Sequence, residues 1–486
     1  MVYTRMRSFL LLLLLFAAPV VSTANAQQQP ADSVKRQLYE SFNKGDVQRF
    51  ATLVDSTDKK QRDEFLLYVL SQAKQSPIEF VRVLLDKGAA VNQPTRYKTP
   101  LMHAAGEGYA DVVTLLLARG AEVNVITDEG NAVMEAVKGG HVETLKLLLE
   151  AKADVKAVHR TGEQALMMAA RQRSYRTPST EPNPEIVRLL LAHGADPNAK
   201  NRWDETALMF ANTAAKVKLL AAKGADLEAK DQEGRTALMK AASRGDVGVV
   251  GALVENGANV NAVDSKGSNA LFYALDRENT AYGDERATLP ARRLEIARRL
   301  LLTRSLDVNA QNSDGETALI RAVRLQNVEM IRSLLERGAD ANRSDVFGDT
   351  AATLAYASGK AEIEQLLPAP AFKGQPLNVL NAFLRAAIGR KDEPNVKALL
   401  AAGADPNHEY AIGYTHKSIK SRVLVLAAGL GHPGIVQLLL NKGADINAKG
   451  LISGSEHGLE FGTALEAAEQ ANKPEVVALL RKARQD

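Results

Sequence analysis

The sequence predicts an all-α solenoid, in which short helix pairs stack one against the next along the chain. Two observations carry this prediction. A segment of the type TALMKAA (236–242) alternates with one that ends in Gly-Ala-Asp and an Asn, as in LLLAHGADPNA (189–199). This unit of roughly 33 residues recurs about twelve times, and a fixed period of this length is typical of arrays whose units contact only their neighbours.

Residues 231–262 illustrate one unit. Thr236 suits the N-cap of a first helix, because its hydroxyl can accept a hydrogen bond from a free backbone N–H. Gly245 ends that helix, a second helix follows, and Gly257 suits the left-handed conformation at its end. The Asn-, Asp- and Gly-rich segment that comes next, here 259–267, turns outward and back. We call each such connection a finger.

Three segments closely resemble the signature of the ankyrin repeat: TPLMHAA (99–105), GHVETLKLLL (140–149) and GHPGIVQLLL (431–440). The resemblance covers roughly residues 63–484 and, more faintly, the chain from residue 34. It implies an L-shaped helix pair in each repeat, a projecting β-turn in each finger, and partner contact through the fingers and the concave side. It says nothing about catalysis.

The predicted organisation has four parts. They are a cleaved signal peptide (1–26), a degenerate N-terminal capping repeat (27–62), an ankyrin block (63–370), and a C-terminal ankyrin block with two long fingers and a capping repeat (371–486).

Changes in spacing mark the segments that depart from the regular unit. The fingers 408–421 and 449–461 are lengthened, and the Pro-rich stretch 368–376 takes the place of a finger. Residues 171–183 and 276–290 are insertions between a first and a second helix. Their polar, Pro-containing composition favours surface loops, and a second contact edge is the alternative.

Large apolar residues occupy the position where the ankyrin pattern usually has His. They are Met102, Met134, Met167, Met209, Met239, Phe272 and Ile320. Packing between layers is the favoured interpretation, and an adaptable apolar groove is the alternative.

The N-terminus has the pattern of a secretory signal. Arg5 and Arg7 precede an apolar run over 9–21, and small residues follow, ending at Ala26. This order of basic, apolar and small residues predicts cleavage after Ala26, which leaves Gln27 as the first residue. We therefore expect a soluble protein that in a bacterium is periplasmic or secreted.

Composition argues against several classes of partner. Without Arg5 and Arg7 the 61 basic residues fall to 59 against 57 acidic ones, and this balance predicts no nucleic-acid partner. The chain has no cysteine, which excludes disulfides and thiolate metal sites. After the run over 9–21, no apolar stretch approaches the ~20 residues that cross a bilayer. We expect a monomer that does not insert into a membrane.

No catalytic pattern is present: the sequence has no GxSxG, HExxH or phosphate-binding Gly-rich loop. We therefore predict no enzyme, no catalytic residue, no cofactor and no metal. The alternative is a Zn²⁺ or Ni²⁺ site in the long fingers, between residues 408 and 460. Its candidate ligands are His408, Glu409, Tyr410, Tyr414, His416, Glu456, His457 and Glu460.

Large aromatic and basic residues on fingers are the candidates for partner contact, because such side chains on a rigid scaffold are typical of binding hot spots. They are Arg96, Tyr97, Arg202, Trp203, Phe347, Tyr410, Tyr414, His416 and His457. Packing on the neighbouring finger is the alternative. The prediction is an exported, non-enzymatic scaffold for an unknown protein partner, and a secreted host-directed effector would share the same binding chemistry.

Overall fold

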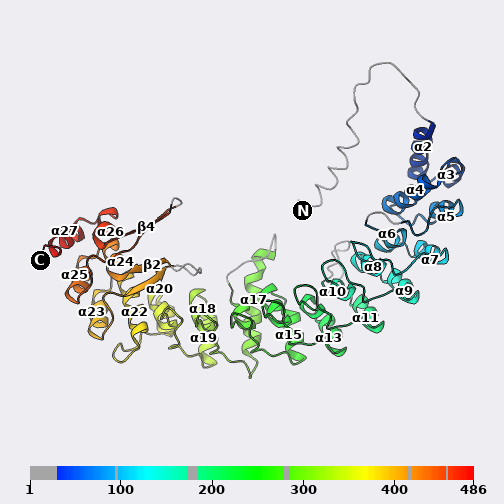
Figure 1. The fold of residues 1–486 in the computed structure, drawn as a ribbon. Helices are drawn as coiled ribbons and strands as arrows, with labels where there is room; N and C mark the ends of the chain where they lie inside the picture. Colours follow the sequence, from blue (N-terminus) through cyan, green and yellow to red (C-terminus); the bar gives the residue numbers. More distant parts are fainter. Residues whose placement is uncertain are drawn as a thin grey trace, which may run out of the picture. The chain divides into compact units, whose positions relative to one another are not determined.

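The computed structural model describes residues 30–93, 97–171, 184–276, 285–412, 419–455 and 458–485. Helices follow one another in pairs along these segments, as the sequence predicts (Figure 1). The chain divides into two compact units between Ala153 and Asp154, and each unit is described by itself.

The described residues of the first unit contain four helix pairs. They are α2 (Pro30–Lys44) with α3 (Val47–Val54), α4 (Lys59–Gln72) with α5 (Ile78–Asp86), α6 (Pro100–Glu107) with α7 (Ala110–Ala118), and α8 (Ala132–Gly139) with α9 (Val142–Glu150).

An aromatic cluster holds the first two pairs together. The ring of Phe50 on α3 meets Phe65 on α4 and Phe80 on α5 at centroid separations of 6.3 and 5.0 Å, both edge-on. Phe42 on α2 also meets Phe80, at 5.1 Å. Edge-to-face pairs of this kind add stability beyond the apolar area that they bury. Aromatic packing therefore stabilises a segment whose sequence only faintly follows the repeat.

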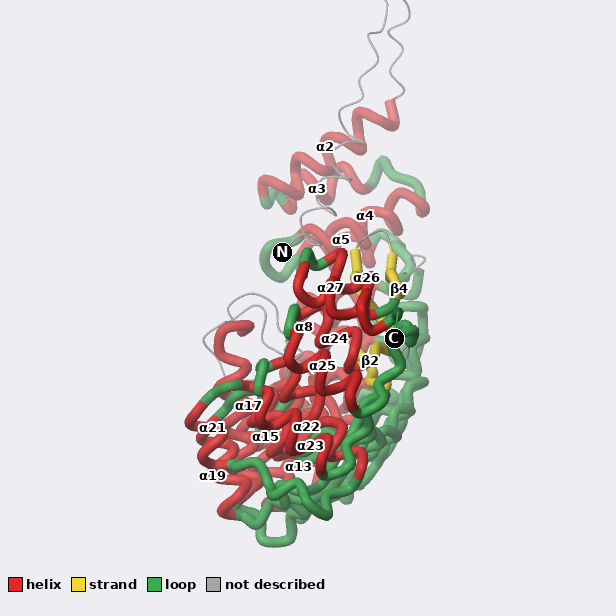
Figure 2. The backbone as a smooth tube through the Cα atoms, turned by 90° about the vertical axis from the view of Figure 1, so that its left-hand side faces the viewer, coloured by secondary structure: helices red, strands yellow, loops and turns green. Residues whose placement is uncertain are grey.

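The second unit continues with helix pairs. They are α10 (Ala165–Arg171) with α11 (Glu185–Ala192), α12 (Ala207–Phe210) with α13 (Ala214–Ala222), α14 (Ala237–Arg244) with α15 (Val247–Glu255), α16 (Ala270–Ala274) with α17 (Glu285–Leu301), α18 (Ala318–Arg324) with α19 (Val328–Glu336), α20 (Ala351–Ser358) with α21 (Ala361–Leu366), α22 (Leu377–Gly389) with α23 (Glu393–Ala401), α24 (Val423–Leu430) with α25 (Pro433–Asn441), and α26 (Ala464–Gln470) with α27 (Pro474–Ala483). Loops run along one side of these helices, and strands lie on the same side (Figure 2).

Those strands form the two long fingers, which are antiparallel β-hairpins. β1 (Glu409–Ile412) pairs with β2 (Ile419–Arg422), and β3 (Gly450–Ser455) pairs with β4 (Gly458–Gly462). The hairpins are neighbours, because the Ser421 hydroxyl on β2 donates to the carbonyl of Leu451 on β3 at 3.3 Å. The lengthened fingers therefore lie side by side, as their consecutive positions in the array predict.

One expectation is wrong. The insertion 276–290 is not a loop throughout, since α17 begins at Glu285. Leu289 near its start is buried and packs against the position where Gly245 would carry a side chain, and this contact extends the helix. Residues 172–183 of the other insertion lie outside the described residues. The favoured interpretation of the row of Met, Phe and Ile, packing between layers, is confirmed, because each of these side chains is at most 1% exposed; the alternative of a groove is wrong.

The Asn of the repeated Gly-Ala-Asp-x-Asn motif connects neighbouring repeats. The Asn198 side-chain amide donates to the carbonyl of Gly224 at 2.8 Å, and its oxygen accepts from the N–H of Asp226 at 2.7 Å. Asn407 makes the same pair of bonds with Gly443 and Asp445. The motif recurs because each repeat needs this side chain to satisfy backbone groups of the next one.

Basic side chains also reach from one repeat to the preceding one. Lys216 on α13, buried at 1% exposure, donates to the carbonyls of Ala169 and Ala170 at the end of α10. Burial lowers the pKa of its ammonium to about 8. Arg244 and Arg293 cap α12 and α14 in the same way. Cations suit these positions because the free carbonyls at a helix C-terminus carry partial negative charge.

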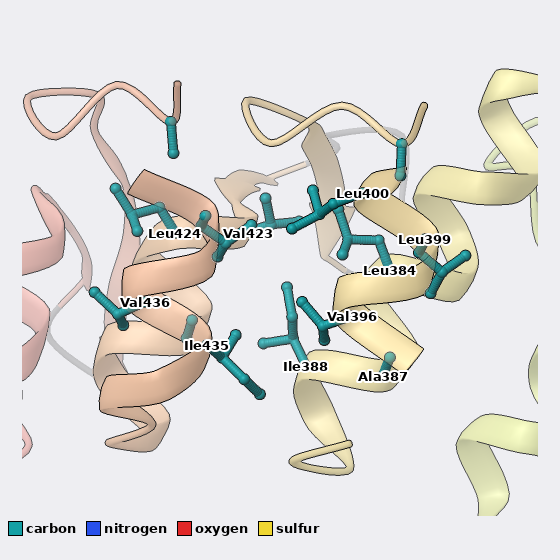
Figure 3. Packing of buried hydrophobic residues seen from close by; sticks show 14 of the residues in the cluster. Leu384, Ala387, Ile388, Val396, Leu399, Leu400, Val423, Leu424, Ile435 and Val436 are labelled. Carbon is teal, nitrogen blue, oxygen red and sulfur yellow. The ribbon is translucent and has the colours of Figure 1, made fainter. Parts of the chain in front are cut away.

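The apolar core of the C-terminal repeats lies between consecutive helix pairs. Ile388 and Leu400, from α22 and α23, lie toward Ile435 and Val423, from α25 and α24 (Figure 3). Phe383 is fully buried in the same core. The β1–β2 hairpin is joined to these layers at both ends, since β1 follows α23 after a short connection and β2 runs directly into α24.

Candidate functional site

The regular fingers of the second unit share one internal hydrogen-bond pattern. A side-chain oxygen at the start of each tip accepts from the backbone N–H groups two and four residues further on, at 2.8–3.1 Å. The accepting residues are Asn201, Asp231, Asp264, Asn312 and Asp345. Asn and Asp suit this position because their short side chains reach the local backbone. Each tip is thereby held in one conformation.

Backbone hydrogen bonds also join each tip to the next. The backbone N–H of Arg202 donates to the carbonyl of Thr161 at 3.4 Å. The N–H of Gln232 likewise donates to the carbonyl of Trp203 at 3.2 Å, and that of Ser265 to the carbonyl of Glu233 at 3.0 Å. Two further bonds of the same kind, Ser313 to Lys266 and Val346 to Asp314, continue the series. The fingers thus form a continuous ladder, and a side chain on one tip keeps a defined position relative to the next tip.

Glycine follows the tip in most of these fingers because no side chain fits there. At Gly234, φ is +78° and a Cβ atom would lie 2.7 Å from the backbone nitrogen of Ser265. The finger that carries Trp203 differs, since its equivalent residue is Asp204, with φ of +60°. Asp tolerates the left-handed region better than most residues, at a cost of roughly 1–2 kcal/mol relative to the usual conformation. This finger therefore keeps the left-handed backbone of its neighbours but carries a side chain where they have glycine.

The structure describes five of the nine predicted contact residues. Tyr97 and Trp203 are exposed, at 47% and 45%, and Arg202 is exposed beside Trp203. Phe347 and Tyr410 are half-buried. Of the others, Arg96, Tyr414, His416 and His457 lie outside the described residues.

The five described residues belong to four different fingers. Arg202 and Trp203 share one finger of the second unit, whereas Tyr97 belongs to the first unit. Phe347 lies on the last regular finger before the Pro-rich stretch, and Tyr410 lies on β1. The finger of Arg202 and Trp203 is therefore the described place where two predicted contact residues are adjacent and exposed.

Tyr410, a predicted partner-contact residue, also packs against the C-terminal core. Its ring packs on the C-terminal core, and the Arg385 guanidinium lies over it at 5.5 Å from the centroid. Burial raises the pKa of its hydroxyl. His408 stands 6.4 Å away, ring to ring, and burial together with Arg385 lowers the pKa of its imidazole. Arg385 is held in turn by Asp349 at 2.5 Å.

Ion pairs at the base of the fingers form a polar row that the sequence analysis missed. The ammonium of Lys240 on α14 lies 2.5 Å from Glu205 and 2.8 Å from Asp231, and Arg235 also pairs with Asp231 at 2.9 Å. Burial raises the pKa of the Asp231 carboxyl, but the hydrogen bonds from Lys240 and Arg235 outweigh it, so that the net shift of the pKa is downward.

The same row recurs further along the unit. Arg324 joins Glu316 at 2.5 Å to Asp345 at 2.8 Å, and Arg321 binds the same glutamate at 2.6 Å. The sequence contains one indication of this polar row, because Lys240 and Arg321 each stand four residues after the Thr at the N-cap position of a first helix. The carboxylate partners of Lys240, and those of Arg324, come from two successive fingers, and sequence spacing alone does not show which fingers meet.

No cluster with metal-binding potential occurs among the residues that the structure describes: nowhere in them do three His, Cys, Asp or Glu side chains converge. His408, Glu409 and Glu460 belong to this part, but His416, Glu456 and His457 do not.

Within the residues that the structure describes, no helix is both long and apolar enough to cross a membrane. An apolar hollow of about 420 Å³ lies between α11 and α13, lined by Pro184, Glu185, Arg188, Ala215, Lys218 and Leu219.

Comparison with known families agrees with this architecture. The chain matches the model described as ankyrin repeats (3 copies) over residues 26–127, 124–201, 176–264, 206–282 and 287–375. It also matches the model of a single ankyrin repeat over residues 423–451. The matches cover most of the chain, including the segment after residue 26 that follows the repeat only faintly.

Similar curated proteins share only part of their length with this chain. An ankyrin repeat and KH domain-containing protein of Caenorhabditis briggsae is 33% identical over 152 residues, which are 31% of this chain and 5% of that protein. An L-asparaginase of Dirofilaria immitis is 32% identical over 177 residues, 34% of this chain and 26% of that protein. A potassium channel of Arabidopsis thaliana is 42% identical over 60 residues, 12% of this chain and 7% of the channel. The chain thus spans about a quarter or less of each relative's length.

Proposed function

Because the chain belongs to the ankyrin-repeat family, we propose that it is a non-enzymatic scaffold that binds a protein partner through its fingers and the concave face of its first helices. Ankyrin repeats are protein–protein interaction modules. The observation that carries the proposal is Trp203, which is 45% exposed on a finger whose backbone is held by Asn201 and by the adjoining fingers. A large aromatic side chain on a rigid support is typical of a binding hot spot.

The neighbouring β-hairpins β1–β2 and β3–β4 extend this contact surface toward the C-terminus. Phe461 on β4 is 49% exposed and stands opposite Leu451 on β3. The two side chains offer apolar area on this finger. We place partner contact on the finger side, from Trp203 to these hairpins, and the array acts as a monomer without nucleic acid, metal or cofactor.

The scaffold is exported in this proposal. The basic, apolar and small-residue regions of residues 1–26 support a bacterial-type signal peptide that is removed after Ala26. Sequencing the N-terminus of protein recovered from periplasm and culture medium is expected to give Gln27 first. Recovery from the medium alone favours a secreted effector, and an intact N-terminus on cytosolic protein contradicts export.

Trp203→Ala is expected to weaken binding of the partner by about 2 kcal/mol, roughly 30-fold in Kd, if the side chain is a hot spot. The measurement is affinity capture of the partner from the cell fraction that holds the protein, followed by titration with purified components. Leu302→Ala is the matched control, because Leu302 is 81% exposed but follows the end of the second helix α17.

The control variant is expected to bind as the wild type does. Unchanged affinity in Trp203→Ala, together with unchanged affinity when either hairpin is replaced by a regular finger, would show that the partner does not use the finger side.

A further inference from the structure

We propose that the fingers around Trp203 bind an acidic, extended protein segment with one apolar side chain that contacts the indole. This inference rests on the proposed scaffold function and names the chemistry of the partner at that surface. The relevant tips are residues 158–161, 200–204 and 230–233, which we call the Trp203 surface.

Four exposed cations lie on the Trp203 surface: Arg160, Lys200, Arg202 and Lys230. Their closeness follows from the finger ladder, since adjoining tips are joined by backbone hydrogen bonds. The Arg202 guanidinium itself reaches the carbonyl of Arg160 on the preceding finger. Lys230 donates to the carbonyl of Val263 on the following finger at 2.7 Å.

None of these four cations forms an ion pair with a carboxylate in the described parts of the chain. Cations of the polar row beneath differ, because Lys240 and Arg235 are each held by two carboxylates. The acids on the three tips are few: exposed Glu233 is paired with Arg235 at 2.9 Å, half-buried Asp204 stands beside Trp203, and Asp231 is buried. The Trp203 surface therefore carries net positive charge that the chain itself leaves available.

Comparison of equivalent finger positions shows that this charge is local. Lys200 and Lys230 precede the Asn or Asp that begins the tip, where other fingers of the unit have Val158, Val263, Gln311 and Ser344. Arg160 and Arg202 follow it, where the others have Gln232, Ser265, Ser313 and Val346. Uniform charge along the array would indicate only a solvated face. A cluster confined to neighbouring fingers instead favours a partner of opposite charge.

Trp203 gives this cluster an apolar centre. Its indole lies between Arg202 and Asp204 in sequence and belongs to the middle finger of the three. The combination selects for carboxylates that flank an apolar side chain, because charged and apolar contacts are then made together. Single-stranded nucleic acid is the less favoured ligand, since its binding sites stack successive bases on several aromatic side chains. On the three tips as described, Trp203 is the one aromatic side chain that is exposed.

The test uses fluorescence, because Trp203 is the only tryptophan of the chain. The full mature protein is titrated with a short synthetic peptide of glutamates around a central leucine, and with the same peptide carrying lysines in place of the glutamates. A thymidine oligonucleotide of equal length is the third probe. We expect a saturable shift of Trp203 emission with the acidic peptide, weakened by added salt, and no saturable shift with the other two probes.

The double variant Lys200→Gln with Arg202→Gln is expected to weaken the acidic peptide at least tenfold. Arg343→Gln, an exposed arginine outside the Trp203 surface, is the matched control and is expected to bind normally. Circular dichroism checks that both variants keep the helical fold, which is expected for exposed side chains.

Three outcomes would overturn the inference. They are equal affinity for the acidic and basic peptides, tighter binding of the oligonucleotide, and unchanged affinity of the double variant for the acidic peptide. The proposed scaffold function is tested separately. A captured partner that is lost with Trp203→Ala but retained by the double variant supports the scaffold and overturns only the inference that its partner is acidic.

Discussion

Phe383→Ala is expected to lower the local free energy of unfolding of the C-terminal repeats by about 3–5 kcal/mol. The Phe383 ring is fully buried on α22 and packs against Tyr356 and Phe372, at centroid distances of 6.0 and 5.6 Å. Its truncation removes apolar contacts and leaves a cavity between layers that cannot collapse without moving α22. The β1–β2 hairpin stands on the same core, through Tyr410, so its order depends on this packing.

Hydrogen exchange measures this effect by region. Amides of α20, α22 and α24 are expected to exchange faster in Phe383→Ala, whereas those of α14 and α15 keep their protection, because each repeat contacts only its neighbours. Phe461→Ala is the matched control, since the Phe461 ring is 49% exposed on β4. Equal loss of protection along the whole second unit would contradict a chain of locally coupled repeats.

Asp231→Ala is expected to cost about 3 kcal/mol, because removing one partner of a buried ion pair leaves the other charges uncompensated. The Asp231 carboxylate, fully buried as a side chain, accepts from Lys240, Arg235 and the backbone N–H of Glu233. Loss of the carboxylate removes these hydrogen bonds and is expected to destabilise the finger that begins at residue 231. Faster exchange of the amides of residues 232–236 and of α14 is the measurement, and Asp314→Ala, an exposed carboxylate on a later tip, is the control.

The destabilisation caused by Asp231→Ala is expected to become smaller as the pH falls. Because the pKa of Asp231 is lowered in the folded protein, its contribution to stability is present above the ordinary aspartate value of about 3.9 and is lost as pH falls through the folded value. The difference in protection between wild type and variant is therefore expected to stay constant from pH 7 to about pH 5 and to narrow in more acidic solution. A difference that grows on acidification would show that Asp231 does not act as a paired carboxylate.

The sequence by itself determined the helix pairs and their order. Gly245 and Gly257 at helix ends, and the Asn of each Gly-Ala-Asp-x-Asn motif, act within a few residues or between adjacent repeats. Thr236 does stand at the N-cap position of α14, but the prediction that its hydroxyl accepts a hydrogen bond from the first turn is wrong. Interactions of this range recur with the period of the repeat, so that a pattern in one dimension is enough to predict them. The same reasoning placed Trp203 on a finger and the two long fingers side by side.

Tertiary structure alone decided which residues the fingers bring together and which of them stay exposed. The start of α17 at Glu285 depends on burial of Leu289 against the preceding repeat, and the Met row is buried by the layers on both sides. Tyr410 is half-buried because Arg385, from the previous helix pair, covers its ring. Likewise, Lys240 is neutralised by carboxylates from two fingers, whereas Lys200 and Arg202 are not. Burial and ion pairing depend on distances between neighbouring layers, and the repeat period carries no information about those distances.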